Sequence, residues 1–121
     1  VLAMRPGCNS ILGIESQGRV IFTMWYADKK TQNHVISRSR LKPGEKVRIA
    51  AAVEVKDNQT TLKLMINGKV EASRSTAQPP YSYGPRLSIA PVRTAGVFIG
   101  SIENMFFANT ALSAEATMKL H

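Results

Sequence analysis

The stretch Val47–Gly68 reads VRIAAAVEVKDNQTTLKLMING, and it decides the fold class. Along Val47–Lys56, apolar residues recur at every second position, which is the period of a strand with one buried face. The same alternation returns along Thr61–Asn67. The residues predicted to face inward are Val47, Ile49, Ala51, Val53 and Val55 in the first strand, and Leu62, Leu64 and Ile66 in the second.

Short turns separate these strands. Asp57–Gln59 turns the chain after the first strand, and Asn67-Gly68 follows the second. Asn-Gly suits a type I′ turn, because both central positions of that turn need a positive φ. A third strand, Lys69–Ser75, then returns along the second. Consecutive antiparallel hairpins are therefore predicted.

The rest of the chain extends this ladder of short strands. One helix is predicted, Ala114–Leu120, with Ser113 as its N-cap. Many short strands and one terminal helix predict an all-β protein, an antiparallel β-sandwich. The remaining predicted strands are Ser10–Glu15, Arg19–Tyr26, His34–Arg40, Arg86–Ala90 and Val97–Ala108.

Composition limits the class of protein. The 121 residues are 44% hydrophobic and 20% charged, which is typical of one globular domain. Lys and Arg number 16 against 8 for Asp and Glu, and the net charge of +8 favours polyanionic partners. No apolar run approaches the roughly 20 residues that span a bilayer, so no membrane insertion is expected. The single cysteine, Cys8, excludes an intrachain disulfide, and no Cys/His cluster has zinc spacing.

Three stretches, in order, resemble the concanavalin A-like lectin and glucanase superfamily, specifically its laminin G-like domains. They are Val47–Lys56, the hairpin Leu62–Lys69, and Phe98–Glu115, which is similar to the closing signature of that family. The resemblance implies a jelly roll whose central, buried strand is Val97–Ala108. It also implies that Leu112 packs on this strand. Ile102, Met105 and Phe107 would then fill one end of the sandwich.

Domains of this family are usually longer at the N-terminus than residues 1–121 allow. Val1–Asn9 is too short to supply the first strands of such a domain. We therefore expect a single domain that lacks those strands or was excised from a larger protein. The rest of that parent polypeptide is an expected partner.

No catalytic or metal site is expected. Glycoside hydrolases of the superfamily carry closely spaced carboxylates, because acid and nucleophile must both reach the scissile bond. Here Glu54 and Asp57 are three apart, and Asp57 lies in a turn. Calcium needs several oxygen ligands, whereas the two aspartates, Asp28 and Asp57, fall in separate loops. The prediction is a non-enzyme without a cofactor.

Basic residues supply the candidate site. Arg38 and Arg40 share one face of a predicted strand, and Lys42, Lys46 and Arg48 follow closely. Guanidinium groups bind carboxylate or sulfate with two parallel hydrogen bonds, which suits an acidic sugar. The same charges could instead only protect a sheet edge from aggregation. Further candidate ligand-binding residues are Arg86, Arg93, and the aromatic residues Trp25, Tyr81 and Tyr83, whose faces could stack on sugars.

Taken with the resemblance, these residues predict a non-catalytic carbohydrate-binding or adhesive module of a larger secreted or surface protein. Its ligand would be an acidic, sialylated or sulfated glycan, and its location extracellular or on the cell surface. The alternative is a structural, protein-interaction domain of a surface or viral assembly, which a large exposed apolar patch would indicate. No nucleic-acid partner is expected, because no recognisable binding module accompanies the charge.

Overall fold

The computed structural model describes residues 3–4, 10–25, 32–77, 88–89, 99–108 and 110–120. These residues form antiparallel strands and one short helix, α1 (Ala114–Met118), so the predicted all-β class with a C-terminal helix is confirmed for them. The strands are β1 (Ala3–Met4), β2 (Ser10–Ile14), β3 (Arg19–Trp25), β4 (Gln32–Arg40), β5 (Ile49–Lys56), β6 (Gln59–Ile66), β7 (Lys69–Thr76) and β8 (Ser88–Ile89).

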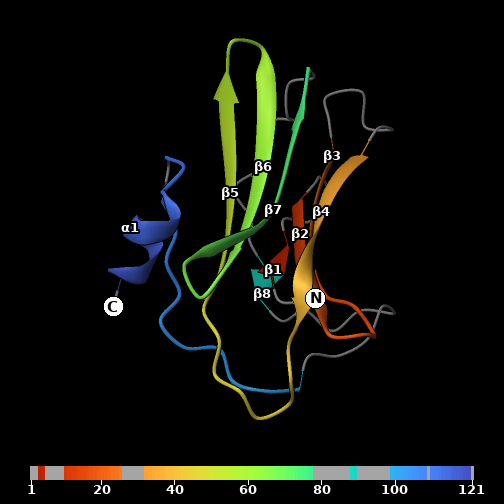
Figure 1. Ribbon diagram of the computed structural model, residues 1–121, viewed down its shortest axis with the longest axis vertical. Helices are drawn as coiled ribbons and strands as arrows, with labels where there is room; N and C mark the ends of the chain where they lie inside the picture. The colour runs from red at the N-terminus through yellow and green to blue at the C-terminus, as the bar shows by residue number, and fades with distance from the viewer. Residues whose placement is uncertain are drawn as a thin grey trace.

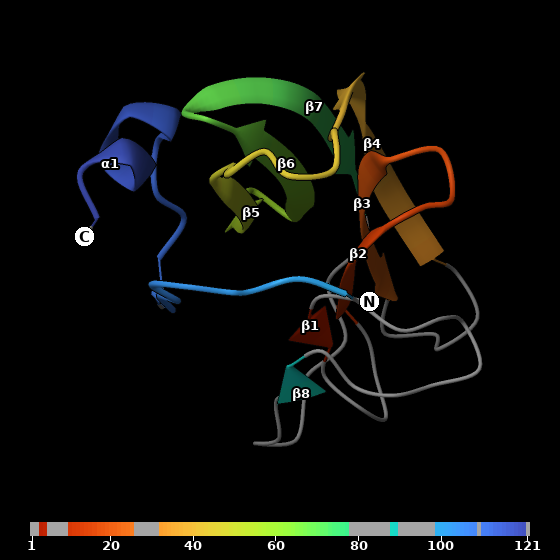
Figure 2. The ribbon, with the colours of Figure 1, turned by 90° about the horizontal axis from the view of Figure 1, so that it is seen from below.

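The strands form two sheets (Figure 1). The larger has the order β4-β3-β2-β1-β8, and the smaller has the order β5-β6-β7. Figure 2, which looks along the strands, shows β7 of the smaller sheet beside β4 of the larger, and these two strands are in contact. Of the predicted strand Arg86–Ala90, Ser88–Ile89 is described and pairs with β1. The described strands therefore form two contacting antiparallel sheets, and the predicted jelly-roll sandwich stays a prediction.

Residues of both sheets build one core. Leu62 and Leu64 of β6 are fully buried, as the alternation predicts. Val55 is 56% exposed, so its predicted burial is wrong; the β5–β6 hairpin extends past β3 and β4 in Figure 1. The core cluster consists of Val20, Phe22 and Met24 of β3, Val35 of β4, and Leu62, Leu64 and Ile66 of β6.

Both two-residue turns of the small sheet have positive φ at each position. Asn67 and Gly68 have φ of 49° and 74°, and Asp57 and Asn58 have φ of 49° and 59°. This is the sign pattern of a type I′ turn, whose twist matches that of the flanking strands. The turn residues thereby fix the register that buries Leu62 and Leu64, and Met65 on the other face of β6 is buried as well.

The predicted N-cap of the helix is confirmed. The Ser113 hydroxyl accepts a hydrogen bond from the Ala116 backbone N–H at 3.1 Å. The helix ends at Met118, before the predicted end at Leu120. A single helical turn of this length depends on contacts with the sheets for its stability.

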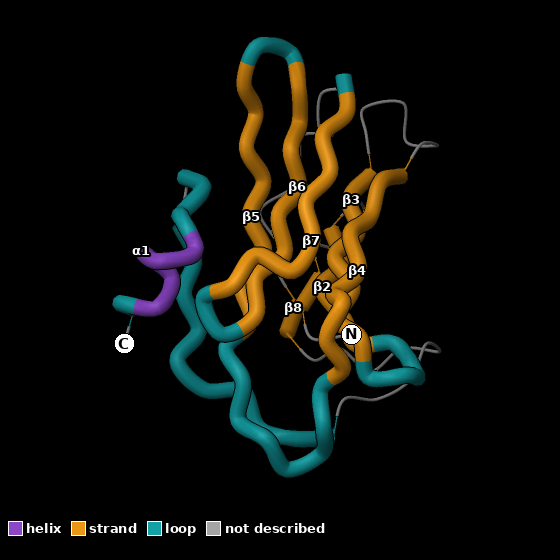
Figure 3. The backbone as a smooth tube through the Cα atoms, in the orientation of Figure 1, coloured by secondary structure: helices purple, strands orange, loops and turns teal. Residues whose placement is uncertain are grey.

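The predicted buried strand Val97–Ala108 is wrong for its described part, 99–108. These residues form no strand, Ile99 is 93% exposed and Ile102 is 39% exposed. Asn104, at φ 49°, interrupts extended backbone. In Figure 3 the segment is a loop that leads to α1, so the predicted packing of the half-buried Leu112 on a strand fails with it.

Candidate functional site

A bulge in β4 provides one wall of the candidate site. It spans Ser37–Ser39, where the pairing of β4 with β3 shifts register. The Ser37 hydroxyl accepts a hydrogen bond from the Val20 N–H at 2.9 Å and donates to the Ser39 carbonyl at 2.7 Å. The bulge is therefore held by its own serine, and it turns neighbouring N–H groups away from β3.

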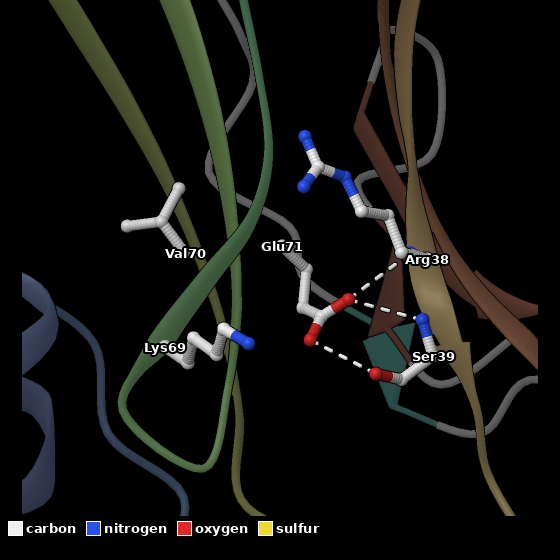
Figure 4. Close-up of a pocket in the computed structure, with 5 residues that line it drawn as sticks. All are labelled: Arg38, Ser39, Lys69, Val70 and Glu71. Atoms are coloured by element: carbon white, nitrogen blue, oxygen red, sulfur yellow. Dashed lines mark hydrogen bonds between the residues drawn. The ribbon is translucent and has the colours of Figure 1, made fainter.

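The carboxylate of Glu71, in β7, accepts hydrogen bonds from those N–H groups (Figure 4). It accepts hydrogen bonds from the backbone N–H of Arg38 at 3.1 Å and of Ser39 at 3.0 Å, and from the Ser39 hydroxyl at 2.9 Å. Glu71 is itself a bulge residue, without a partner in β6, and is 8% exposed. One carboxylate thus joins the two sheets at opposed bulges.

These contacts lower the pKa of Glu71 below its ordinary value. The largest cause is the backbone N–H of Ser39; burial opposes it, and the Ser39 hydroxyl, the Arg38 N–H and the Lys69 charge assist. Glu71 is therefore ionised at neutral pH and has no proton to donate. Its carboxylate oxygens already accept hydrogen bonds from β4.

Two adjoining surface hollows flank this contact, and both are lined by Ser39, Lys69 and Glu71. The first, of about 200 Å³, also includes Arg38; the second, of about 340 Å³, includes Arg40. We call this surface the β4–β7 groove and define it by Arg38, Ser39, Arg40, Lys69, Val70 and Glu71.

Arg38 and Lys69 are the available cations of the groove. Arg38 is exposed on β4, and Figure 4 shows its guanidinium directed away from Glu71. Neither side chain forms an ion pair within 4.0 Å among the described residues. Arg40 donates to the Gln17 side chain at 3.1 Å, a contact between neutral and charged groups that leaves its charge uncompensated.

The other members of the predicted basic cluster are used elsewhere, so the cluster does not form one patch. Lys42 lies 3.9 Å from Glu45, and Lys46 lies 2.7 Å from Glu103. Arg48 donates hydrogen bonds to backbone carbonyls at the end of α1. Sequence spacing alone could not identify the partner of Lys46, because Glu103 is distant along the chain.

Arg48 fixes the end of α1. Its Nη1 donates to the carbonyls of Thr117 at 3.0 Å and Met118 at 2.8 Å, which are among the unpaired acceptors at a helix C-terminus. Its backbone exchanges two hydrogen bonds with Asn67, at 2.8 and 2.9 Å. Arg48 thereby ties the helix to the β6–β7 turn.

Several predicted site residues fall outside the described part. They are Tyr81, Tyr83, Arg86 and Arg93. Trp25 ends β3, and its side chain is also outside the described part. Within the described residues, no group of three His, Cys, Asp or Glu side chains could hold a metal ion.

Sequence reasoning missed four groove residues: Ser39, Lys69, Val70 and Glu71. The one available signal is Glu71, the single acidic residue within β7, because acidic residues are uncommon inside strands. Its partner on β4 is distant along the chain. No local pattern connects the two bulges.

No match was found when the chain was compared with protein-family models, with curated proteins and with solved structures. The resemblance to laminin G-like domains thus stays a prediction. Among the described residues, no helix has the length and apolar character needed to cross a membrane.

Proposed function

We propose that this chain is a non-catalytic module that binds acidic glycans at the β4–β7 groove. One observation carries the proposal: Arg38 and Lys69 line a hollow whose only carboxylate, Glu71, is occupied by β4. The Arg38 hollow therefore has two cationic side chains against one carboxylate, and a second carboxylate, that of Glu45, lines only the adjoining hollow. A carboxylated or sulfated sugar supplies the missing anion.

The shape of the groove favours a glycan chain over a small enclosed ligand. Pockets for drug-sized molecules usually have about 300–1,000 Å³ and bury most of the ligand. The two hollows have about 200 and 340 Å³, and both are open to solvent, so neither would bury most of a small ligand. A polymer lying across the surface can place one anionic group in each hollow, with the Arg38 fork as its more specific contact.

Binding without catalysis fits the state of Glu71. An ionised carboxylate that accepts three hydrogen bonds cannot protonate a leaving group, as a glycosidase acid must. The proposal places the module, with its jelly-roll form, in a larger secreted or surface protein. Trp25, Tyr81 and Tyr83 are the proposed stacking residues.

The test is binding to neutral, sialylated and sulfated glycans at low and physiological salt. We expect Arg38→Ala and Lys69→Ala each to weaken sulfated or sialylated glycan binding about tenfold, the value of one lost charged hydrogen bond. Arg74→Ala is the matched control, because Arg74 is exposed on β7 outside the groove. Equal binding by all variants, or equal binding of neutral glycans, would refute the site.

A second candidate, a protein-interaction domain, is favoured by a different observation. Large apolar side chains are exposed along segment 99–108, with Ile99 at 93% and Phe107 at 67%. That is the predicted mark of the alternative function. These residues lie outside the β4–β7 groove, so this candidate function concerns a different surface.

A further inference from the structure

Segment 99–108 exposes more large apolar side chains than any other part of the described chain. Phe106 and Phe107 are 47% and 67% exposed, and Ile99 is 93% exposed. The full set, which we call the apolar strip, is Ile99, Ile102, Met105, Phe106 and Phe107. Contiguous exposed apolar residues of this kind usually mark a surface that another molecule covers.

The backbone of the segment is also unpaired. Among the described residues, no backbone hydrogen bond joins 99–108 to another part of the chain. The one polar contact is between side chains, from Lys46 to Glu103 at 2.7 Å. Figures 2 and 3 show the segment as a loop that runs to α1 without joining either sheet. With respect to the part of the chain that the structure describes, it therefore offers both apolar side chains and unpaired backbone N–H and C=O groups.

We propose that segment 99–108 docks an extended, acidic segment of a partner protein by strand pairing. In this mode, main-chain hydrogen bonds supply affinity and alternate side chains supply specificity. The apolar strip would cover the apolar face of the incoming strand. Asn104, at φ 49°, divides the segment, but asparagine changes between left-handed and extended backbone at low cost.

The positive charge of the chain favours an acidic partner at segment 99–108. The chain carries a net charge of +8, so a second copy would be repelled and an acidic segment attracted. The contact between Lys46 and Glu103 also places the loop before β5 next to the segment. Lys42, Lys46 and Arg48 of that loop stand against Glu45 and against Glu103 of the segment, so three cations face two carboxylates and one positive charge is left over. An acidic partner would therefore meet complementary charge beside the apolar strip.

The experiment measures fluorescence anisotropy with a labelled peptide of alternating Glu and Val, about as long as the segment. Controls are a Lys-Val peptide and a Glu-Val peptide interrupted by proline, which cannot complete the strand pairing. The variants are Phe107→Ser and Val55→Ser. Val55 is the matched control, because it is a similarly exposed apolar residue at the opposite end of β5.

We expect the Glu-Val peptide to bind the parent and Val55→Ser alike, and Phe107→Ser about tenfold more weakly, as for an aromatic anchor at an interface. Both control peptides should bind at least about tenfold more weakly to the parent. Absence of Glu-Val binding, or equal binding by Phe107→Ser or by either control peptide, would overturn the proposal. A parent dimer that Phe107→Ser dissociates in sedimentation would overturn it too, since the occupant would be a second copy.

This inference is independent of the glycan proposal. Arg38→Ala should leave peptide binding unchanged, and Phe107→Ser should leave glycan binding unchanged. Loss of peptide binding in Arg38→Ala would show that the peptide binds the β4–β7 groove by charge. That result would also refute docking at segment 99–108.

Discussion

Strand β6 and segment 99–108 are both rich in large apolar residues, yet they have opposite environments. Leu62 and Leu64 of β6 are fully buried, whereas Ile99 is 93% exposed. β6 lies between two strands that its own short turns hold in register. Segment 99–108 has no such neighbour among the described residues. The difference teaches that apolar content produces a buried strand only where the local sequence also supplies a partner.

The largest effect expected from this comparison is in the core. Leu64→Ala should lower the free energy of unfolding by about 2–5 kcal/mol, because it removes buried methyl groups and leaves a cavity. Ile99→Ala should change it by less than about 0.5 kcal/mol, as at other exposed positions. Chemical denaturation of both variants measures the difference. A large loss in Ile99→Ala would mean that the segment is buried in solution, which would break the comparison.

The same difference explains which parts of the fold could be predicted from the sequence. The small sheet was predictable because Asn67-Gly68 and the alternation of Leu62, Leu64 and Ile66 specify pairing, register and buried face within one short stretch. The fate of segment 99–108 was not predictable in this way. Its burial depends on contacts with distant residues, which its own sequence does not specify.

The candidate site was predictable only in part. Arg38 could be chosen from charge and strand spacing, and it does line the groove. Lys69 and Glu71 could not, because two bulges in separate sheets bring them to Arg38. A bulge changes which face a residue occupies, and period-two reasoning has no means to anticipate it.

Substitutions at two carboxylates extend the comparison, with an intermediate expected effect on the free energy of unfolding. Glu71 is buried at the junction of the sheets, and Glu103 is exposed in segment 99–108. Glu71→Gln should cost about 1.5–3 kcal/mol, the range for hydrogen bonds to a charged group. Glu103→Gln should leave the denaturation midpoint unchanged, since an exposed ion pair contributes little. Similar losses in both variants would contradict the structural role given to Glu71.

The cost of Glu71→Gln should also depend on pH. The pKa of Glu71 is lowered in the folded state, so its carboxylate stabilises the fold above the ordinary glutamate value of about 4.3. This contribution is lost as the pH falls below that value and through the folded pKa. The stability difference between parent and Glu71→Gln should therefore be constant near neutral pH and shrink in acid. A difference that grows in acid would have the wrong sign.

The smallest effect tests how α1, which follows segment 99–108, is held against the β6–β7 turn. A Cβ at Gly68 would lie 2.3 Å from Cγ of Met118, and Gly68 has φ of 74°. Gly44 is the matched control, with φ of 83° and no atom within 4 Å of its added Cβ. Both alanine variants bear the left-handed backbone cost of about 1–2 kcal/mol. Gly68→Ala should cost a few tenths of a kcal/mol more, because the flexible Met118 side chain must move.

A double variant isolates that contact. Adding Met118→Ala to Gly68→Ala should remove the extra cost of Gly68→Ala. The double variant of Gly68 and Met118 should therefore show an interaction energy, whereas the double variant of Gly44 and Met118 should show none. Denaturation of the three single variants and the two double variants measures it. If Gly68→Ala costs no more than Gly44→Ala, the helix is not seated on the turn in solution. The end of the helix would then depend on the hydrogen bonds from Arg48, and the exposed apolar strip before the helix would have a less fixed position for any partner.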